Sequence, residues 1–146
     1  MKVNTKAYGE IEIDEKQKIT IPQGLFGFEE YKNFVLIDAE QEPFFWLQSV
    51  DEADIAFILI NPFMFRTDYE INAENDELAE IGINSPQDAL IFSIVTIPQD
   101  GGPMTANLQG PLIVNKSKMT GMQAILTDIR WKTKHDIMAE LKEAGK

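Results

Sequence analysis

Six carboxylates between residues 68 and 80 form the densest group of side chains in this sequence that could do chemistry. Such a set of oxygen ligands could suggest calcium, but an EF-hand loop needs ligands at fixed offsets, a central glycine and a final glutamate, and this segment lacks that order. Carboxylate pairs also act as acid and base in glycoside hydrolysis, yet these lie in apparent turns without the aromatic platform that a sugar needs. The sequence therefore specifies neither a metal site nor a catalytic pair here. The six residues are Asp68, Glu70, Glu74, Asp76, Glu77 and Glu80.

Few other residues could support catalysis. The chain has one histidine, His135, and no cysteine, so the usual pairs of nucleophile and base are nearly absent. His135 lies in a polar segment, and we expect it to be an exposed surface residue. The tetrad at residues 51–54 spells a helicase box, but no phosphate-binding loop accompanies it and a polar turn is the simpler interpretation. We expect no enzymatic activity and no cofactor.

Asn107 and Gln109 are the most suggestive polar pair. Both fall on the parity of their strand opposite to a row of apolar residues, so they would point to the opposite face of the sheet. Two interpretations remain open. They could line a small-molecule or catalytic site inside a β-barrel, or they could satisfy neighbouring backbone groups.

Charge is more informative about partners. The formal net charge is -11. Residues 1–115 carry 20 acidic and 6 basic side chains (-14), whereas residues 116–146 carry 4 acidic and 7 basic ones (+3). An anionic body repels phosphate backbones and attracts basic proteins, so we expect no direct binding of nucleic acid. An acidic surface that only maintains solubility is the alternative.

The absence of cysteine fits a reducing compartment. The first residues contain no apolar run of signal-peptide length, and no stretch approaches the ~20 apolar residues of a membrane helix. We expect a cytoplasmic protein that does not bind a membrane.

A predicted hairpin from Leu90 to Asn115 organises the chain. Asp100-Gly101-Gly102 can supply the positive φ angles of a tight turn. The first arm, Leu90 to Ile97, is apolar at nearly every position, which indicates a strand covered on both faces. The second arm alternates, and Gly110-Pro111 interrupts it with a bend or bulge. The apolar parity of this arm comprises Met104, Ala106, Leu108, Leu112 and Val114.

Several shorter apolar runs predict further strands. Phe44 to Leu47 places three aromatic residues in a row, which favours a strand with both faces covered. Ile55 to Ile60 is apolar on both parities and should be the most buried strand, whereas Phe26 and Phe28 should close one end of the core. Together these runs predict a mostly β, small, single-domain antiparallel β-barrel-like fold with short helices.

Two segments have helical patterns. Ala73 to Ile81 predicts a short amphipathic helix with Leu78 and Ile81 facing the core. Residues 130–146 predict a possible helical tail with its apolar positions on one face. These positions are Ile137, Met138 and Leu141.

Several short segments, in order over roughly residues 3 to 127, carry a family resemblance. The most specific is the hairpin segment Thr105 to Asn115, TANLQGPLIVN; the others are Gly24 to Glu29, Phe45 to Ser49, Asp68 to Glu70 and Gly121 to Gln123. Together they resemble the flagellar assembly factor FliW family. Gly110 stands where the family usually has alanine, and Phe26 where proline is common. The tail after Arg130 does not match, and the whole chain, 1–146, would form one FliW-like domain.

The resemblance implies a non-enzymatic, monomeric factor that binds flagellin in the cytoplasm. When free of flagellin, such a factor binds the RNA-binding translational regulator CsrA and relieves its repression of flagellin mRNA. For this chain we expect acidic residues to engage the cationic regulator and exposed apolar residues to receive a helix of one partner. The candidate contact residues are Asp68, Glu70, Glu74, Glu77, Phe63, Phe65 and Asn107.

Overall fold

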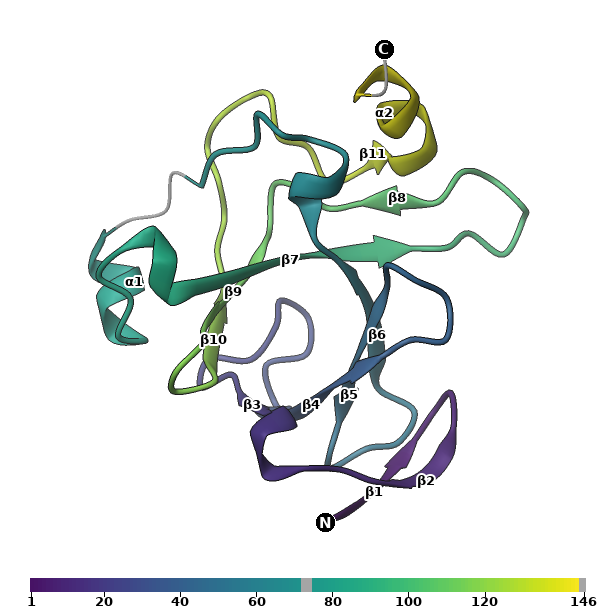
Figure 1. Cartoon of the computed structure of the whole chain (residues 1–146), viewed down its shortest axis with the longest axis vertical. Helices are drawn as coiled ribbons and strands as arrows, with labels where there is room; N and C mark the ends of the chain where they lie inside the picture. The colour runs from purple at the N-terminus through teal and green to yellow at the C-terminus, as the bar shows by residue number, and fades with distance from the viewer. Residues whose placement is uncertain (72–74, 145–146) are drawn as a thin grey trace.

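The apolar strands close into a seven-stranded barrel (Figure 1). The computed structural model describes residues 1–71 and 75–144. The barrel closes because β7 pairs with β6 on one side and with β9 on the other. All its pairings are antiparallel except that of β3 with β10. In order around the barrel the strands are β7 (Ala89–Thr96), β6 (Ala56–Ile60), β5 (Phe45–Ser49), β4 (Asn33–Asp38), β3 (Lys18–Thr20), β10 (Thr120–Gln123) and β9 (Leu112–Asn115). The prediction of a mostly β, barrel-like fold with short helices is confirmed.

The barrel strands are apolar on both parities because both of their faces contact an apolar core. One core lies inside the barrel and two lie against its outer surface. One parity fills the barrel interior, with residues such as Phe34, Leu47 and Leu112. The outer face of β4 is covered by the hairpin of β1 (Lys2–Thr5) and β2 (Gly9–Glu12). The outer faces of β6, β7 and β9 are covered by residues 65–71 and 75–83 and by the C-terminal part of the chain, including Trp131. We call this cluster the C-terminal core. Strands buried on both faces lose the simple alternation of a one-sided sheet.

The three consecutive aromatics illustrate this arrangement. Phe45 packs in the barrel interior, Trp46 packs under the β1–β2 hairpin, and Phe44 packs against the C-terminal core. The prediction that both faces are covered at this point is therefore confirmed.

The central hairpin divides at its bend. The first half of β7 pairs with β9 inside the barrel, and its second half pairs with β8 (Thr105–Ala106) outside it. Gly101 lies in the loop of residues 97–104 between β7 and β8 with φ 82°, a left-handed conformation that favours glycine. The loop is longer than the tight turn predicted from Asp100-Gly101-Gly102. Gly110 and Pro111 lie between β8 and β9, where the predicted bend carries the chain from the outer strand into the barrel.

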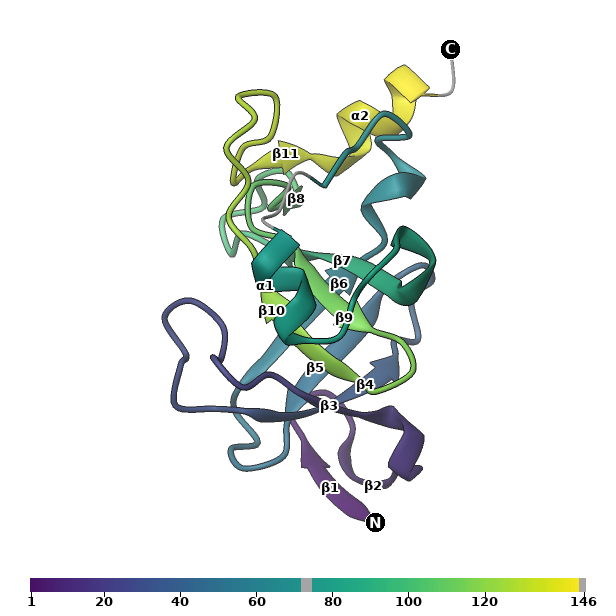
Figure 2. The same ribbon diagram turned by 90° about the vertical axis from the view of Figure 1, so that its left-hand side faces the viewer.

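The chain ends in a layer at one end of the barrel. β11 (His135–Asp136) pairs with β8, and α2 (Ile137–Ala144) follows it. Figure 2 shows α2 and β11 at the end opposite the β1–β2 hairpin. Of the three apolar residues expected on one helix face, only Ile137 is buried, whereas Met138 and Leu141 are exposed. The helix packs on the body through its first turn.

The helix α1 (Asn75–Glu80) lies within the predicted segment, whose beginning at Ala73 falls outside the described residues. Leu78 and Ile81 pack toward the C-terminal core, as expected. Short 3₁₀ turns at Glu15–Gln17, Pro62–Met64 and Pro86–Asp88 connect strands.

Two burial predictions for the barrel and its ends are wrong. The segment Ile55 to Ile60 is not the most buried, because its first four residues lie half-buried near one barrel end, whereas all four residues of β9 are buried between two cores. Phe26 does not close the core and is 51% exposed. Phe28 alone does so, through an edge-to-face contact with Phe57 at 5.0 Å.

Candidate protein-binding surface

The predicted acidic residues Asp68 and Glu70 lie together, but each is paired with an arginine. Arg66 donates to both carboxylate oxygens of Asp68, at 2.9 and 2.8 Å. Arg130 donates to Glu70 at 3.1 Å and to Asp128 at 2.7 Å. The two bonds from Arg66 fix the Asp68 carboxylate geometrically, whereas Glu70 accepts a single bond from Arg130. Arg66 lies only two residues before Asp68, but Arg130 lies 60 residues after Glu70, so the sequence did not reveal the pair with Glu70.

A buried tryptophan sits between the two arginines. The guanidinium carbons of Arg66 and Arg130 lie 4.9 and 4.7 Å from the Trp131 ring centroid, within the range of a cation–π interaction. Trp131 is 2% exposed, and its ring meets Tyr69 edge-to-face at 4.8 Å. We call this group the arginine–tryptophan cluster. Its members are Arg66, Asp68, Glu70, Asp128, Arg130, Trp131 and Glu140.

A hydrogen bond and burial shift the pKa values of two groups in and beside this cluster. The Arg66 guanidinium donates to Asp68 and holds the pKa of that carboxyl below its usual range. Burial raises the pKa of the Tyr69 hydroxyl above its ordinary value, and that hydroxyl donates to the Leu108 carbonyl. Asp68 therefore remains ionised and Tyr69 neutral over the physiological pH range.

His135 is buried, so the prediction that it is exposed is wrong. Its Nε2 atom accepts from the Lys132 amide at 2.9 Å, and its Nδ1 atom lies 2.8 Å from a Glu140 oxygen. An Nε2 that accepts from an amide leaves the proton on Nδ1, which donates to Glu140. The same Glu140 oxygen also accepts from Arg66 at 3.0 Å. We predicted exposure from the polar neighbours of His135 in sequence, which do not show that β11 pairs with β8 and so buries the ring.

The two predicted phenylalanines have different environments. Phe63 is 39% exposed, whereas Phe65 is 1% exposed and belongs to the C-terminal core. Phe65 is therefore not available to a partner. The 3₁₀ turn Pro62–Met64 replaces an extended strand here, so Phe63 and Phe65 do not point to the same side as a period of two residues would predict. Met64 is 49% exposed and takes the place on the surface that the sequence assigned to Phe65.

The remaining predicted contact residues, Glu74, Glu77 and Asn107, have different environments. Glu77 is exposed in the first turn of α1, where the helix dipole stabilises a negative side chain. Glu74 lies outside the described residues. Asn107 accepts from the Gly110 amide at 2.8 Å and so holds the bend before β9.

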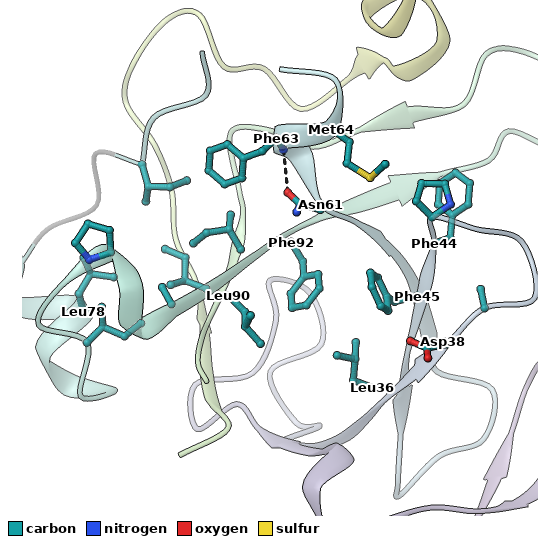
Figure 3. Close-up of a pocket in the computed structure, with 18 of the residues that line it drawn as sticks. Leu36, Asp38, Phe44, Phe45, Asn61, Phe63, Met64, Leu78, Leu90 and Phe92 are labelled. Atoms are coloured by element: carbon teal, nitrogen blue, oxygen red, sulfur yellow. Dashed lines mark hydrogen bonds between the residues drawn. The ribbon is translucent and has the colours of Figure 1, made fainter. Parts of the chain in front are cut away.

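An apolar groove of about 1150 Å³ adjoins Phe63 and Met64 (Figure 3). Its floor includes Leu36, Phe45, Leu90 and Phe92, whose side chains otherwise fill the barrel interior. The groove thus opens into one end of the barrel. Its other walls are the 3₁₀ turn Pro62–Met64, the helix α1 and the turn between β4 and β5. Leu78, Phe63, Met64 and Phe44 mark its rim in Figure 3.

The groove offers little to catalysis. Its ionisable lining residues are Asp38 and Glu42, both exposed at the β4–β5 end. The Asn61 carboxamide, which also lines it, caps the 3₁₀ turn by accepting from the Phe63 amide at 3.0 Å. Asn107 and Gln109 do not line this groove, so it gives no support to the small-molecule interpretation at those residues.

The described residues contain no group of three or more histidine, aspartate or glutamate side chains placed to hold a metal ion. Among the same residues, no helix is long and apolar enough to cross a membrane.

Comparison with known proteins gives the family. A family model described as FliW protein matches residues 2–137. The chain belongs to the FliW family. The resemblance found in the sequence is therefore confirmed.

Named relatives cover nearly the whole chain. A flagellar assembly factor FliW of Treponema denticola is 51% identical and covers 100% of this chain and 99% of that protein. One of Leptospira biflexa is 43% identical, with 97% and 94% covered. A crystal structure of the flagellar assembly factor FliW matches with a TM-score of 0.85 at 40% identity, covering 94% of this chain and 96% of that one. These relatives are named as assembly factors and not as enzymes.

Proposed function

We propose that this chain is a non-enzymatic flagellar assembly factor of the cytoplasm that acts by switching between two protein partners. It binds flagellin, and when flagellin has been exported the freed factor binds the translational regulator CsrA. Binding prevents CsrA from repressing flagellin mRNA. The factor acts as a monomer and contacts neither nucleic acid nor membrane directly.

The open apolar groove is the observation that carries this proposal. A folded monomer gains nothing from exposing so much apolar surface beside its own core, and exposed patches of this kind mark sites of protein association. The groove contains no reactive pair of groups among its lining residues. An apolar groove that an amphipathic helix can fill is a recurring mode of protein recognition. Phe63, which we predicted to contact a partner helix, lies on its rim.

Charge supports the second half of the switch. The net charge of -11 favours association with a regulator whose surface is built to bind RNA. Once bound, the same negative field opposes the approach of phosphate groups and lowers the affinity of the regulator for RNA. Because screening weakens this effect, the loss of RNA affinity should shrink as salt rises.

A three-component titration tests the proposal. CsrA is first bound to a labelled leader RNA of flagellin mRNA, and the chain is then added. We expect RNA to be released, and we expect added flagellin monomer to restore the RNA complex by withdrawing the chain. If the purified chain binds neither flagellin nor CsrA at micromolar concentrations, the proposal is wrong.

A further inference from the structure

The groove is chemically uneven along its length. Asp38 and Glu42 lie at the end formed by β4 and the turn that follows it, and the rest of the lining is apolar or uncharged, with no lysine or arginine. Within residues 1–71 and 75–144 neither carboxylate has a hydrogen-bond or ion-pair partner. In the arginine–tryptophan cluster, by contrast, Asp68, Glu70 and Asp128 are each held by a guanidinium. Asp38 and Glu42 are therefore free to pair with charge brought by a partner.

The dimensions of the groove suit one helix. An α-helix with side chains is about 10 Å wide and rises 1.5 Å per residue, so a groove of this volume accommodates roughly ten residues, or about three turns. Apolar walls stand on several sides, from Leu78 of α1 to Phe44 at the start of β5 (Figure 3). A helix with apolar residues spaced three and four apart would place them against Phe45, Leu90 and Phe92 on the floor.

We propose that the groove binds an amphipathic helix of about three turns that carries lysine or arginine at the end lying beside Asp38 and Glu42. The apolar face of the helix supplies affinity, and its basic end sets the register and the direction in which it lies. This inference rests on the proposed function, because it describes the segment by which a protein partner is recognised. It also assigns the electrostatic part of recognition to Asp38 and Glu42 and not to Asp68 and Glu70.

Paired charge reversals test this assignment. The variant D38K/E42K changes the groove, and D51K/D54K changes two exposed carboxylates in the turn at the opposite end of β5. Each variant shifts the net charge from -11 to -7, since two negative charges become two positive ones. Binding of flagellin and of CsrA to both variants and to the natural chain is measured by titration calorimetry at low and high salt.

We expect D38K/E42K to weaken binding of at least one partner about tenfold or more at low salt, with a smaller loss at high salt. We expect D51K/D54K to stay within about twofold of the natural chain. Equal losses in the two variants would mean that only the overall field matters, and no loss in D38K/E42K would remove these carboxylates from recognition. Either outcome overturns the inference while leaving the proposed function standing.

Designed peptides separate the two proposals further. The probe is a 16-residue amphipathic helix ending in two lysines, compared with one ending in two glutamates and with one interrupted by a central proline. The natural chain should prefer the lysine peptide and D38K/E42K the glutamate peptide, and proline should abolish binding. If flagellin and CsrA fail to bind but this pattern holds, the proposed function is wrong and the groove assignment survives. The assignment is contradicted if the natural chain does not bind the lysine peptide, or if D38K/E42K keeps the preference of the natural chain. It is also contradicted if the proline peptide still binds, since that indicates an extended occupant.

Discussion

Asp68 and Asp38 are both exposed carboxylates beside apolar side chains, yet their surroundings give them different roles. Asp68 is held by Arg66, which itself lies over a buried tryptophan. Asp38 has no partner within the described residues and borders an open groove. In the arginine–tryptophan cluster each carboxylate pairs with a guanidinium, and the Arg66–Glu140 pair attaches the C-terminal segment to the barrel. The groove leaves both its charge and its apolar surface unsatisfied.

The comparison shows how a stabilising region differs from a binding region made of the same residue types. In the cluster, ion pairs surround an aromatic ring that is already buried, so the contacts stabilise the fold. In the groove, Phe63 and Met64 remain partly exposed although the barrel core lies directly beneath them. Substitutions in the cluster should therefore change the free energy of unfolding, and substitutions in the groove should change partner affinity.

The largest effect should follow from removing the centre of the cluster. Trp131→Ala deletes a side chain packed against Tyr69 and two arginines, and we expect a loss of about 3–5 kcal/mol in the free energy of unfolding. Ile129→Ala is the matched control, because Ile129 is 90% exposed and should change stability by less than about 0.5 kcal/mol. Urea unfolding followed by circular dichroism measures both. Equal stabilities would show that the C-terminal segment does not depend on this ring.

A charge placed in the groove should weaken binding without unfolding the protein. Met64→Asp puts a carboxylate on the groove rim, and we expect partner affinity to fall about tenfold because the helix must desolvate that charge. Met138→Asp, at a residue 56% exposed on α2 and outside the groove lining, is the control. Titration calorimetry with flagellin and with CsrA should separate the two variants. If Met138→Asp weakens binding as much as Met64→Asp, the contact surface is not confined to the groove.

A smaller effect should follow from removing one arginine. Arg66→Met keeps the stem over Trp131 but loses the pairs to Asp68 and Glu140, and we expect a cost of about 1–2 kcal/mol. Arg130→Met should cost less, because Arg130 is more exposed than Arg66. Thermal unfolding gives the order of the two variants. The reverse order would mean that the Glu70 and Asp128 pairs dominate the cluster.

The smallest effect concerns pH. Arg66 lowers the pKa of Asp68 in the folded state, so the unfolded state binds more protons as pH falls through the ordinary aspartate range. The stabilisation is present above about pH 5 and is lost as pH falls below about 4 toward the folded-state pKa. Because Asp68 is largely exposed, we expect only a fraction of a kcal/mol. The stability difference between the natural chain and Arg66→Met should therefore shrink on acidification; a difference constant from pH 7 to pH 3 would assign it to packing alone.

Local patterns in the sequence were sufficient for the scaffold. The turn at Gly101 and the bend at Gly110 and Pro111 follow from backbone preferences that act over a few residues. The apolar run of β7 likewise indicated, from a few adjacent residues, that both faces of this strand are covered. The position of each covering layer could not be read locally, because it depends on contacts between segments distant in the chain.

The candidate site was less predictable for that reason. The residues next to Phe65 and His135 in sequence do not indicate that either is buried. The 3₁₀ turn Pro62–Met64 directs Phe65 inward, and the two-residue strand β11 buries His135. The arginine that pairs with Asp68 is its near neighbour in sequence, but the arginine that pairs with Glu70 comes from a distant segment. The groove is assembled from β4, β5, β7, β9, α1 and several turns between strands, so no single stretch carries its signal. Among the described residues predicted to contact a partner, Phe63 lines the groove.

Methyl NMR of the chain titrated with unlabelled partner tests the central claim most directly. If a partner docks in the groove, the methyl signals of Leu36, Met64, Leu78 and Leu90 should shift, and those of Met138 and Leu141 on α2 should stay in place. Shifts confined to α2 and the segment around Trp131, with the groove methyls unchanged, would contradict the account.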